Sequence, residues 1–77
     1  IKILDDHKTE YLLVQCKHWK KPIPPGEMRN FKAGCDDEKT EYEKVLMFMS
    51  SSKFSPGARE YAEKHNIKLI DGDDLLK

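Results

Sequence analysis

The chain has 77 residues, and its 14 lysines and arginines balance 14 aspartates and glutamates, which leaves no net charge at neutral pH. A chain of this length forms at most one small domain, which buries only about 60% of its unfolded surface. The charge balance excludes a general electrostatic attraction to nucleic acid or membrane, so an anionic partner requires a local basic patch.

The apolar runs and the cysteines indicate in which cellular compartment the protein is expected. No apolar stretch approaches the ~20 residues of a membrane-spanning helix, and no segment resembles a signal peptide. Cys16 and Cys35 lack the spacing of a CxxC pair or a zinc motif, which indicates reduced thiols used as small apolar residues. We therefore expect an intracellular protein, in the cytoplasm or in an organelle.

Two strand-like runs open the chain, at residues 1–4 and 11–19, and the polar segment between them predicts an antiparallel hairpin. Because side chains alternate along a strand with period two, Gln15 and Lys17 share one face. The opposite face carries the apolar residues Leu12, Val14 and Cys16. We expect this apolar face to be covered, while the rigid strand presents the polar pair.

The middle of the chain predicts a helix followed by a strand. From about Gly26 the apolar residues recur at helical spacing, and Gly34 lies close to where this helix should stop. Residues 45–49 then form a continuous apolar run, which is typical of a strand covered on both faces. We expect this strand to be central in the sheet.

Capping signals predict a second helix. Ser55 offers its hydroxyl as an N-cap, Pro56 suits the first helical position, and Asn66 suits a left-handed stop. Residues 67–70 form a last strand, and the turn at residues 71–72 leads into a terminal helical stub. The order ββαβαβ indicates an α/β fold, in which a right-handed crossover makes the last two strands parallel.

Three segments of the chain resemble one family. Residues 13–19 (LVQCKHW) resemble the active strand of Mrr-type restriction endonucleases, a branch of the PD-(D/E)xK nuclease superfamily in which glutamine often stands at the acidic position. Residues 50–62 (SSSKFSPGAREYA) resemble the strand, loop and helix of that family, and residues 67–75 (IKLIDGDDL) resemble its closing strand and turn. The resemblance covers nearly the whole chain and implies a restriction-endonuclease-like mixed sheet.

The resemblance also implies that residues 1–77 are the C-terminal part of a single catalytic domain, without its N-terminal helix and the start of its first catalytic strand. In this family an aspartate opens the strand before the one that carries the lysine. Pairing Leu4 with Tyr11 places the partner of Gln15 just upstream of Ile1, so we expect that aspartate to lie outside this chain. The two aspartates of the hairpin, Asp5 and Asp6, are interpreted as turn formers. We expect the 77 residues alone to be inactive.

Phosphodiester hydrolysis explains why such residues are needed. A divalent cation neutralises charge in the transition state and generates hydroxide, and a nearby ammonium orients the attacking water. The resemblance implies Mg²⁺, with Gln15 and the Cys16 carbonyl as ligands and with Gln15 and Lys17 as catalytic residues. Because an amide carries no charge, Gln15 should bind metal weakly unless a second acid supplies the charge.

Double-stranded DNA is the implied partner, and five further residues are candidates for contacting it. Basic or hydroxyl side chains can bind phosphates; the candidates are Lys20, Lys21, Arg29, Ser51 and Lys53. Ordinary surface solvation remains the alternative for each of them. We also expect the chain to form a homo-oligomer or to pair with the rest of its own domain, because an uncovered hairpin would expose apolar groups.

Two classes of function remain open. The leading hypothesis is a metal-dependent DNA endonuclease. The alternative is a non-catalytic module that keeps the nuclease fold for DNA binding or for protein association. Resolvases that cut branched DNA share the same fold and are a further possibility within the nuclease class. Fold alone does not decide between these functions.

Overall fold

A computed structural model describes residues 2–4 and 9–72 of the chain, with side chains from Glu10 onward. Along the chain the elements are β1 (Lys2–Leu4), β2 (Thr9–Lys17), α1 (Pro25–Asp37), β3 (Glu43–Ser50), α2 (Pro56–Lys64) and β4 (Ile67–Ile70). The predictions for Asp5, Asp6 and the terminal stub fall mainly outside the described residues. Within those residues, neither helix combines the length and the apolar character needed to cross a membrane.

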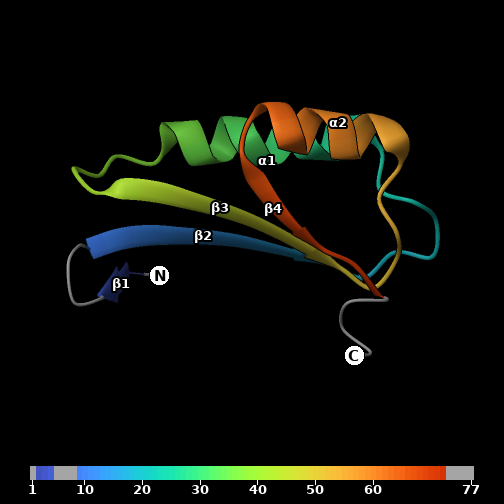
Figure 1. Cartoon of the computed structure of the whole chain (residues 1–77), viewed down its shortest axis with the longest axis horizontal. Coiled ribbons are helices and arrows are strands. Elements are labelled where there is room, and N and C mark those ends of the chain that lie inside the picture. Colours follow the sequence, from blue (N-terminus) through green and yellow to red (C-terminus); the bar gives the residue numbers. More distant parts are fainter. Residues whose placement is uncertain (1, 5–8, 73–77) are drawn as a thin grey trace.

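The strands form one mixed sheet in the order β1-β2-β3-β4 (Figure 1). β1 is antiparallel to β2, whereas β2, β3 and β4 are mutually parallel. The antiparallel hairpin and the parallel closing pair agree with the sequence prediction. Because β2 and β3 run in the same direction, their carboxyl ends and the loops that follow lie at one edge of the sheet (Figure 1).

The core lies between the helices and one face of the sheet. Its buried apolar residues are Ile23, Met28, Cys35, Leu46, Phe48, Phe54, Ala58, Ala62 and Ile67. Phe48 is fully buried, and its ring packs edge-on against Phe31 and Phe54, with centroid separations of 5.4 and 5.7 Å. Such perpendicular aromatic pairs are a favourable arrangement, so Phe48 joins the sheet, α1 and the loop before α2.

The other face of the sheet is open among the described residues, and this differs from the sequence prediction. Along β3, Leu46, Phe48 and Ser50 are buried, while the residues between them are only partly buried. On β2, Val14 is 37% exposed and the Cys16 thiol is exposed as well. The expectation that residues 45–49 are covered on both faces is therefore wrong, as is the expected covering of the Val14 and Cys16 face.

The handedness of the crossovers explains why the helices share one face. The connections β2–α1–β3 and β3–α2–β4 both step in the same direction across the sheet. Right-handed crossovers that step in one direction place their helices on the same side, as Figure 1 shows. The period-two alternation of β2 is correct in the prediction, but the helices cover the face of Gln15 and Lys17.

The ends of α2 follow local sequence signals, whereas packing sets the end of α1. Ser55 Oγ accepts a hydrogen bond of 3.1 Å from the Ala58 backbone N–H, and Asn66 has a φ of 57°; both predictions for α2 are confirmed. In contrast, α1 continues past Gly34 to Asp37. Burial of Cys35 and the ion pair between Lys32 and Asp36 favour this continuation, so the helix ends three residues beyond the glycine near which its end was predicted.

The register of the hairpin also differs from the prediction. Leu4 pairs with Thr9, so the predicted pairing of Leu4 with Tyr11 is wrong by two residues. With the observed register the position opposite Gln15 moves two residues further upstream than predicted, so it still precedes Ile1.

Candidate functional site

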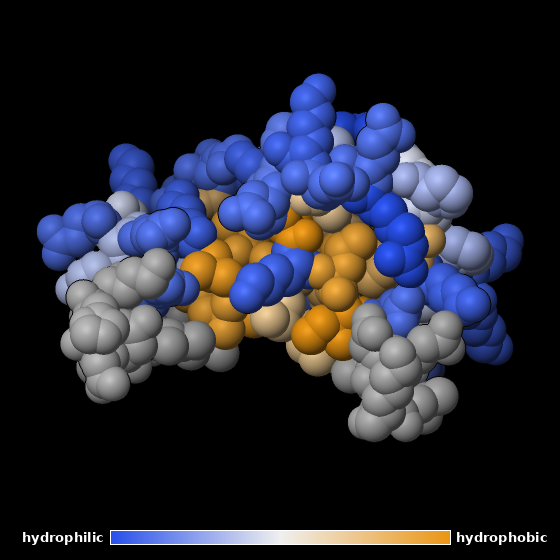
Figure 2. Space-filling view, in the orientation of Figure 1, coloured by the Kyte–Doolittle hydropathy of each residue, from blue (hydrophilic) through white to orange (hydrophobic). Residues whose placement is uncertain are grey.

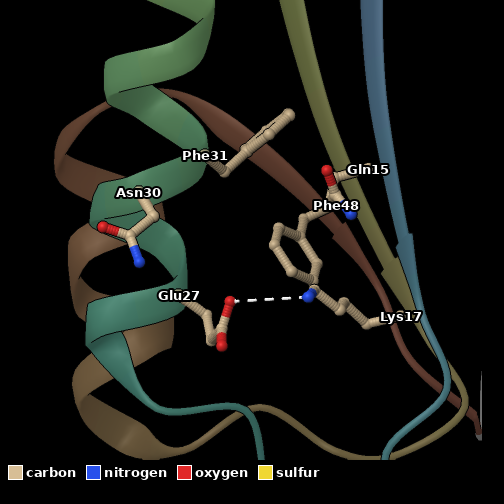
Figure 3. A pocket seen from close by; sticks show the side chains of 6 residues that line it. All are labelled: Gln15, Lys17, Glu27, Asn30, Phe31 and Phe48. Atoms are coloured by element: carbon tan, nitrogen blue, oxygen red, sulfur yellow. Dashed lines mark ion pairs between the residues drawn. The ribbon is translucent and has the colours of Figure 1, made fainter.

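The end of β2 and the start of α1 enclose a pocket that contains the predicted polar pair. The pocket is lined by Gln15, Lys17, Glu27, Asn30, Phe31 and Phe48 (Figure 3). Gln15 and Lys17 reach it because alternate residues of β2 face the helices. The structure therefore brings these two predicted site residues together, against the aromatic side chains of the core.

Lys17 meets a carboxylate in this pocket. Its Nζ lies 3.8 Å from Glu27 Oε2, and the two side chains are 34% and 24% exposed (Figure 3). Glu27 lies in the first turn of α1, where an acidic residue is favoured by the partial positive charge of the helix N-terminus. The sequence analysis missed this residue, because an acid in a first helical turn is ordinarily explained by the helix dipole alone.

The backbone around Glu27 is firmly anchored. Pro25 occupies the first helical position of α1. Upstream, Ile23 is fully buried, its N–H donates to the Lys53 carbonyl at 2.9 Å, and its carbonyl accepts from the Ser55 N–H at 3.0 Å. The next residue in the helix, Met28, is also fully buried. Glu27 is therefore presented from a fixed position opposite the end of β2.

The oxygen atoms in and beside the pocket suit a hard cation better than a soft one. Gln15 Nε2 donates a long hydrogen bond of 3.4 Å to the Cys16 carbonyl, which leaves the Gln15 amide oxygen as an acceptor on the same side chain. Among the pocket-lining residues Glu27 alone has a carboxylate. Within the described part of the chain, no three His, Cys, Asp or Glu side chains gather as a metal site. The donor types fit Mg²⁺, which binds few protein carboxylates and retains waters.

The serines at the end of β3 and just after it lie against the end of β2. The Ser51 N–H donates to the Lys17 carbonyl at 3.2 Å, and Ser51 Oγ donates to the Trp19 carbonyl at 3.4 Å. Ser50 is buried, and its hydroxyl contacts that of Ser52 at 3.0 Å. The candidate residue Ser51 is therefore next to the backbone of Lys17, at the same edge of the sheet.

Three of the basic candidates also lie near this edge. Lys20 and Lys21 are exposed in the loop that follows β2, and Lys53 is exposed in the loop that follows β3. A bridge between Ile23 and Phe54 holds the two loops side by side (Figure 1). Lysine charges from two separate segments are thus brought to the end of the sheet that carries Lys17.

Arg29 is placed elsewhere. It lines a groove between the two helices, together with residues of α2 such as Glu60 and Lys64. It does not line the pocket of Gln15 and Lys17. The structure therefore does not bring this candidate together with the others, because its position on α1 points it toward α2.

Three groups at or near the C-terminal end of α1 have shifted pKa values. Lys32 donates hydrogen bonds of 2.7 and 2.8 Å to Asp36, and they hold the pKa of the Asp36 carboxyl below its ordinary value. Burial raises the pKa of the Cys35 thiol, with a smaller contribution from the charge of Asp36. The Tyr11 hydroxyl donates to Glu38 at 3.1 Å, which raises the pKa of Tyr11. The Lys32–Asp36 contact stabilises the last turn of α1, and the Tyr11–Glu38 hydrogen bond joins β2 to the residue after α1.

Comparison with known proteins identifies the family of the chain. The family model Mrr_cat, described as restriction endonuclease, matches residues 1–77. No curated protein and no solved structure matches the chain. The mixed α/β architecture is consistent with a restriction-endonuclease-like fold, and the family indicates a nuclease that acts on DNA. Since the match spans the whole chain, the chain belongs to the Mrr-type restriction endonuclease family.

Proposed function

We propose that the chain carries the catalytic residues Gln15 and Lys17 of a Mg²⁺-dependent DNA endonuclease that hydrolyses phosphodiester bonds. The observation that carries the proposal is the shared pocket at the end of β2, into which both side chains project in a member of a restriction endonuclease family. A rigid strand holds the two side chains in a fixed relation, which catalysis of this kind requires.

The chemistry assigned to each residue follows from its functional group. The ammonium of Lys17 donates hydrogen bonds to a phosphate oxygen or to the attacking water, and stabilises the negative charge that develops in the transition state. The amide oxygen of Gln15 and the carbonyl of Cys16 are the protein groups that would hold the cation. When bound, Mg²⁺ supplies charge neutralisation and lowers the pKa of water. The nearby core residues Phe31 and Phe48 limit the access of bulk water from the helix side.

Duplex DNA would approach the edge of the sheet at which β2 and β3 end. The exposed Lys20, Lys21 and Lys53 would contact phosphates there, and Ser51 offers a hydroxyl beside Lys17. Arg29 would contact DNA only if the duplex also ran across the helices. This arrangement provides the local basic patch that a chain of zero net charge needs in order to attract DNA.

The proposed reaction is tested with the full-length protein on supercoiled plasmid. We expect nicking or linearisation with Mg²⁺ and none with a chelator, and we expect a Gln15→Ala variant to need more Mg²⁺ for the same rate. Lys20→Ala combined with Lys21→Ala should weaken DNA binding and reduce its salt dependence. A full-length protein that is folded and binds DNA but does not cut with Mg²⁺ would contradict the proposed reaction.

A non-catalytic DNA-binding or protein-association module is the second candidate. It is favoured by the neutral amide at Gln15 and by the presence of a single carboxylate, that of Glu27, among the residues lining the pocket. Such a module would bind DNA with equal affinity in Mg²⁺ and in chelator and would leave the plasmid intact. The plasmid assay therefore separates the two candidates directly.

We also propose that the chain self-associates through the open face of its sheet. This face carries Val14, Cys16, Met47 and Met49, none of which is fully covered. Figure 2 shows apolar side chains gathered over the strands, with a polar side chain among them and further polar ones over the helices. Contiguous exposed apolar surface is typical of protein interaction sites, and a second copy presents the same apolar face.

A further inference from the structure

The contact between Lys17 and Glu27 is not explained by stability alone. It joins the end of β2 to the first turn of α1 across a partly exposed pocket, at 3.8 Å. Ion pairs with this degree of exposure contribute little to folding, because solvent screens the attraction and the lysine loses side-chain freedom. The other contacts of this region already anchor the start of the helix, because Ile23 is hydrogen-bonded to the loop before α2 and Met28 is buried in the core.

The contact with Glu27 does, however, restrict the movement of the Lys17 ammonium, on which the proposed reaction depends. A lysine ammonium stands at the end of a long flexible chain, and it has three protons to donate. A carboxylate on one side leaves protons free for a phosphate oxygen or a water on the other side. Because Glu27 projects from an anchored helix start, it holds the ammonium over the pocket before any substrate arrives (Figure 3).

We propose that Glu27 is a positioning residue of the site, which acts by orienting the Lys17 ammonium toward the scissile phosphate. The inference rests on the proposed nuclease function and adds to it a residue from α1. Glu27 also cancels the charge of Lys17 in the free pocket. Its removal is therefore expected to misplace the ammonium while making the pocket more attractive to a polyanion.

The test compares Glu27→Gln with Glu63→Gln in the full-length protein, using plasmid cleavage in Mg²⁺. Glu63 is an exposed glutamate on α2, so this control removes the same charge away from the pocket. We expect Glu27→Gln to lower kcat by about ten- to a hundredfold, as loss of an orienting partner commonly does. Its KM for DNA should stay the same or fall. The control should keep both parameters of the wild type.

A conservative variant and a metal-binding measurement distinguish positioning from other roles. Glu27→Asp keeps the charge and should recover part of kcat, even if Glu27→Gln lowers the melting temperature. Binding of Mn²⁺ in the absence of DNA, measured by electron paramagnetic resonance, should be similar for Glu27→Gln and wild type. Loss of Mn²⁺ binding in Glu27→Gln would overturn the proposal, because Glu27 would then be a metal ligand.

The outcomes for the inference and for the proposed function differ. If the wild type cuts and Glu27→Gln has the kcat of Glu63→Gln, the positioning role is overturned and the nuclease function stands. If Glu27→Asp recovers none of the lost kcat, orientation by a carboxylate is likewise overturned. If the folded wild type does not cut at all, the proposed function itself fails, and the positioning role fails with it.

Discussion

Three separate parts of the fold form the surroundings of Lys17. The alternation of β2 sends it toward the helices, the loop after β3 fixes its carbonyl through the Ser51 N–H, and Glu27 lies 3.8 Å from its Nζ. The alternation itself can be read from the sequence, because it is local and places Gln15 and Lys17 on one face; which face the helices cover cannot. The other two depend on segments that only the folded sheet brings together.

Asp36 provides a residue-scale prediction about pH. Its pKa is lowered mainly by the hydrogen bond from Lys32, so its ionised form favours the folded state. A depressed pKa contributes stability above the unfolded value, and this contribution is lost as the pH falls below about 4 toward the lower folded value. We expect Lys32→Met to reduce the free energy of unfolding slightly at neutral pH and not at a pH below both values.

Urea denaturation at neutral and at acidic pH measures this difference. Lys39→Met is the control, because Lys39 is an exposed lysine in the loop after α1. It removes the same charge and should show no comparable dependence on pH. An equal loss of stability by Lys32→Met at both pH values would show that its contribution does not come from the ionised Asp36.

At the scale of elements, the end of β4 is fastened to the rest of the fold at Asp71 and Gly72. Arg59 donates a hydrogen bond of 2.9 Å to Asp71 and so ties α2 to this point. Gly72 lies so close to the loop after β3 that a Cβ there would collide with the Ser51 carbonyl. The glycine therefore permits a close backbone approach that holds the loop beside Lys17.

Gly72→Ala is accordingly expected to reduce the free energy of unfolding by about 1–3 kcal/mol, the usual cost of an added methyl group in a close contact. Gly34→Ala is a matched substitution, because a Cβ at Gly34 meets no atom within 4 Å. It should stabilise α1 by about 0.5–1 kcal/mol, since alanine favours a helix over glycine. Thermal or urea denaturation tests both, and equal effects of the two substitutions would contradict the close approach at Gly72.

The elements also show how far the sequence can be read. Ser55, Pro56 and Asn66 act within a few residues of themselves, so the ends of α2 could be predicted. The face that the helices cover could not, because it depends on the order of the strands. Glu27 was missed for a similar reason: its partner Lys17 lies on another element, and an acid in a first turn has a simpler local explanation.

At the scale of the whole molecule, two helices on one side of the sheet leave an apolar face on the other. Val14 and Met47 are opposite each other in the parallel pairing of β2 and β3, in the middle of this face. We expect the wild-type chain to associate as its concentration rises, and we expect Val14→Lys or Met47→Lys to keep it monomeric. Light scattering measures the molar mass of each variant in solution and so distinguishes monomers from associated chains.

Ala33→Lys is the control for this prediction. Ala33 is exposed on α1, so the substitution adds the same charge to the helical side of the molecule. Association should persist in this variant, because the open face is unchanged. A wild-type chain that stays monomeric at high concentration would contradict self-association through the sheet.

The central claim is that Lys17 acts in phosphodiester hydrolysis, and plasmid cleavage by full-length Lys17→Ala tests it most directly. Lys39→Ala removes the same charge from an exposed loop and serves as the control. We predict that Lys17→Ala abolishes Mg²⁺-dependent cutting while it still folds and binds DNA, and that Lys39→Ala cuts as the wild type does. Undiminished cutting by Lys17→Ala would contradict the assignment of the site to this pocket.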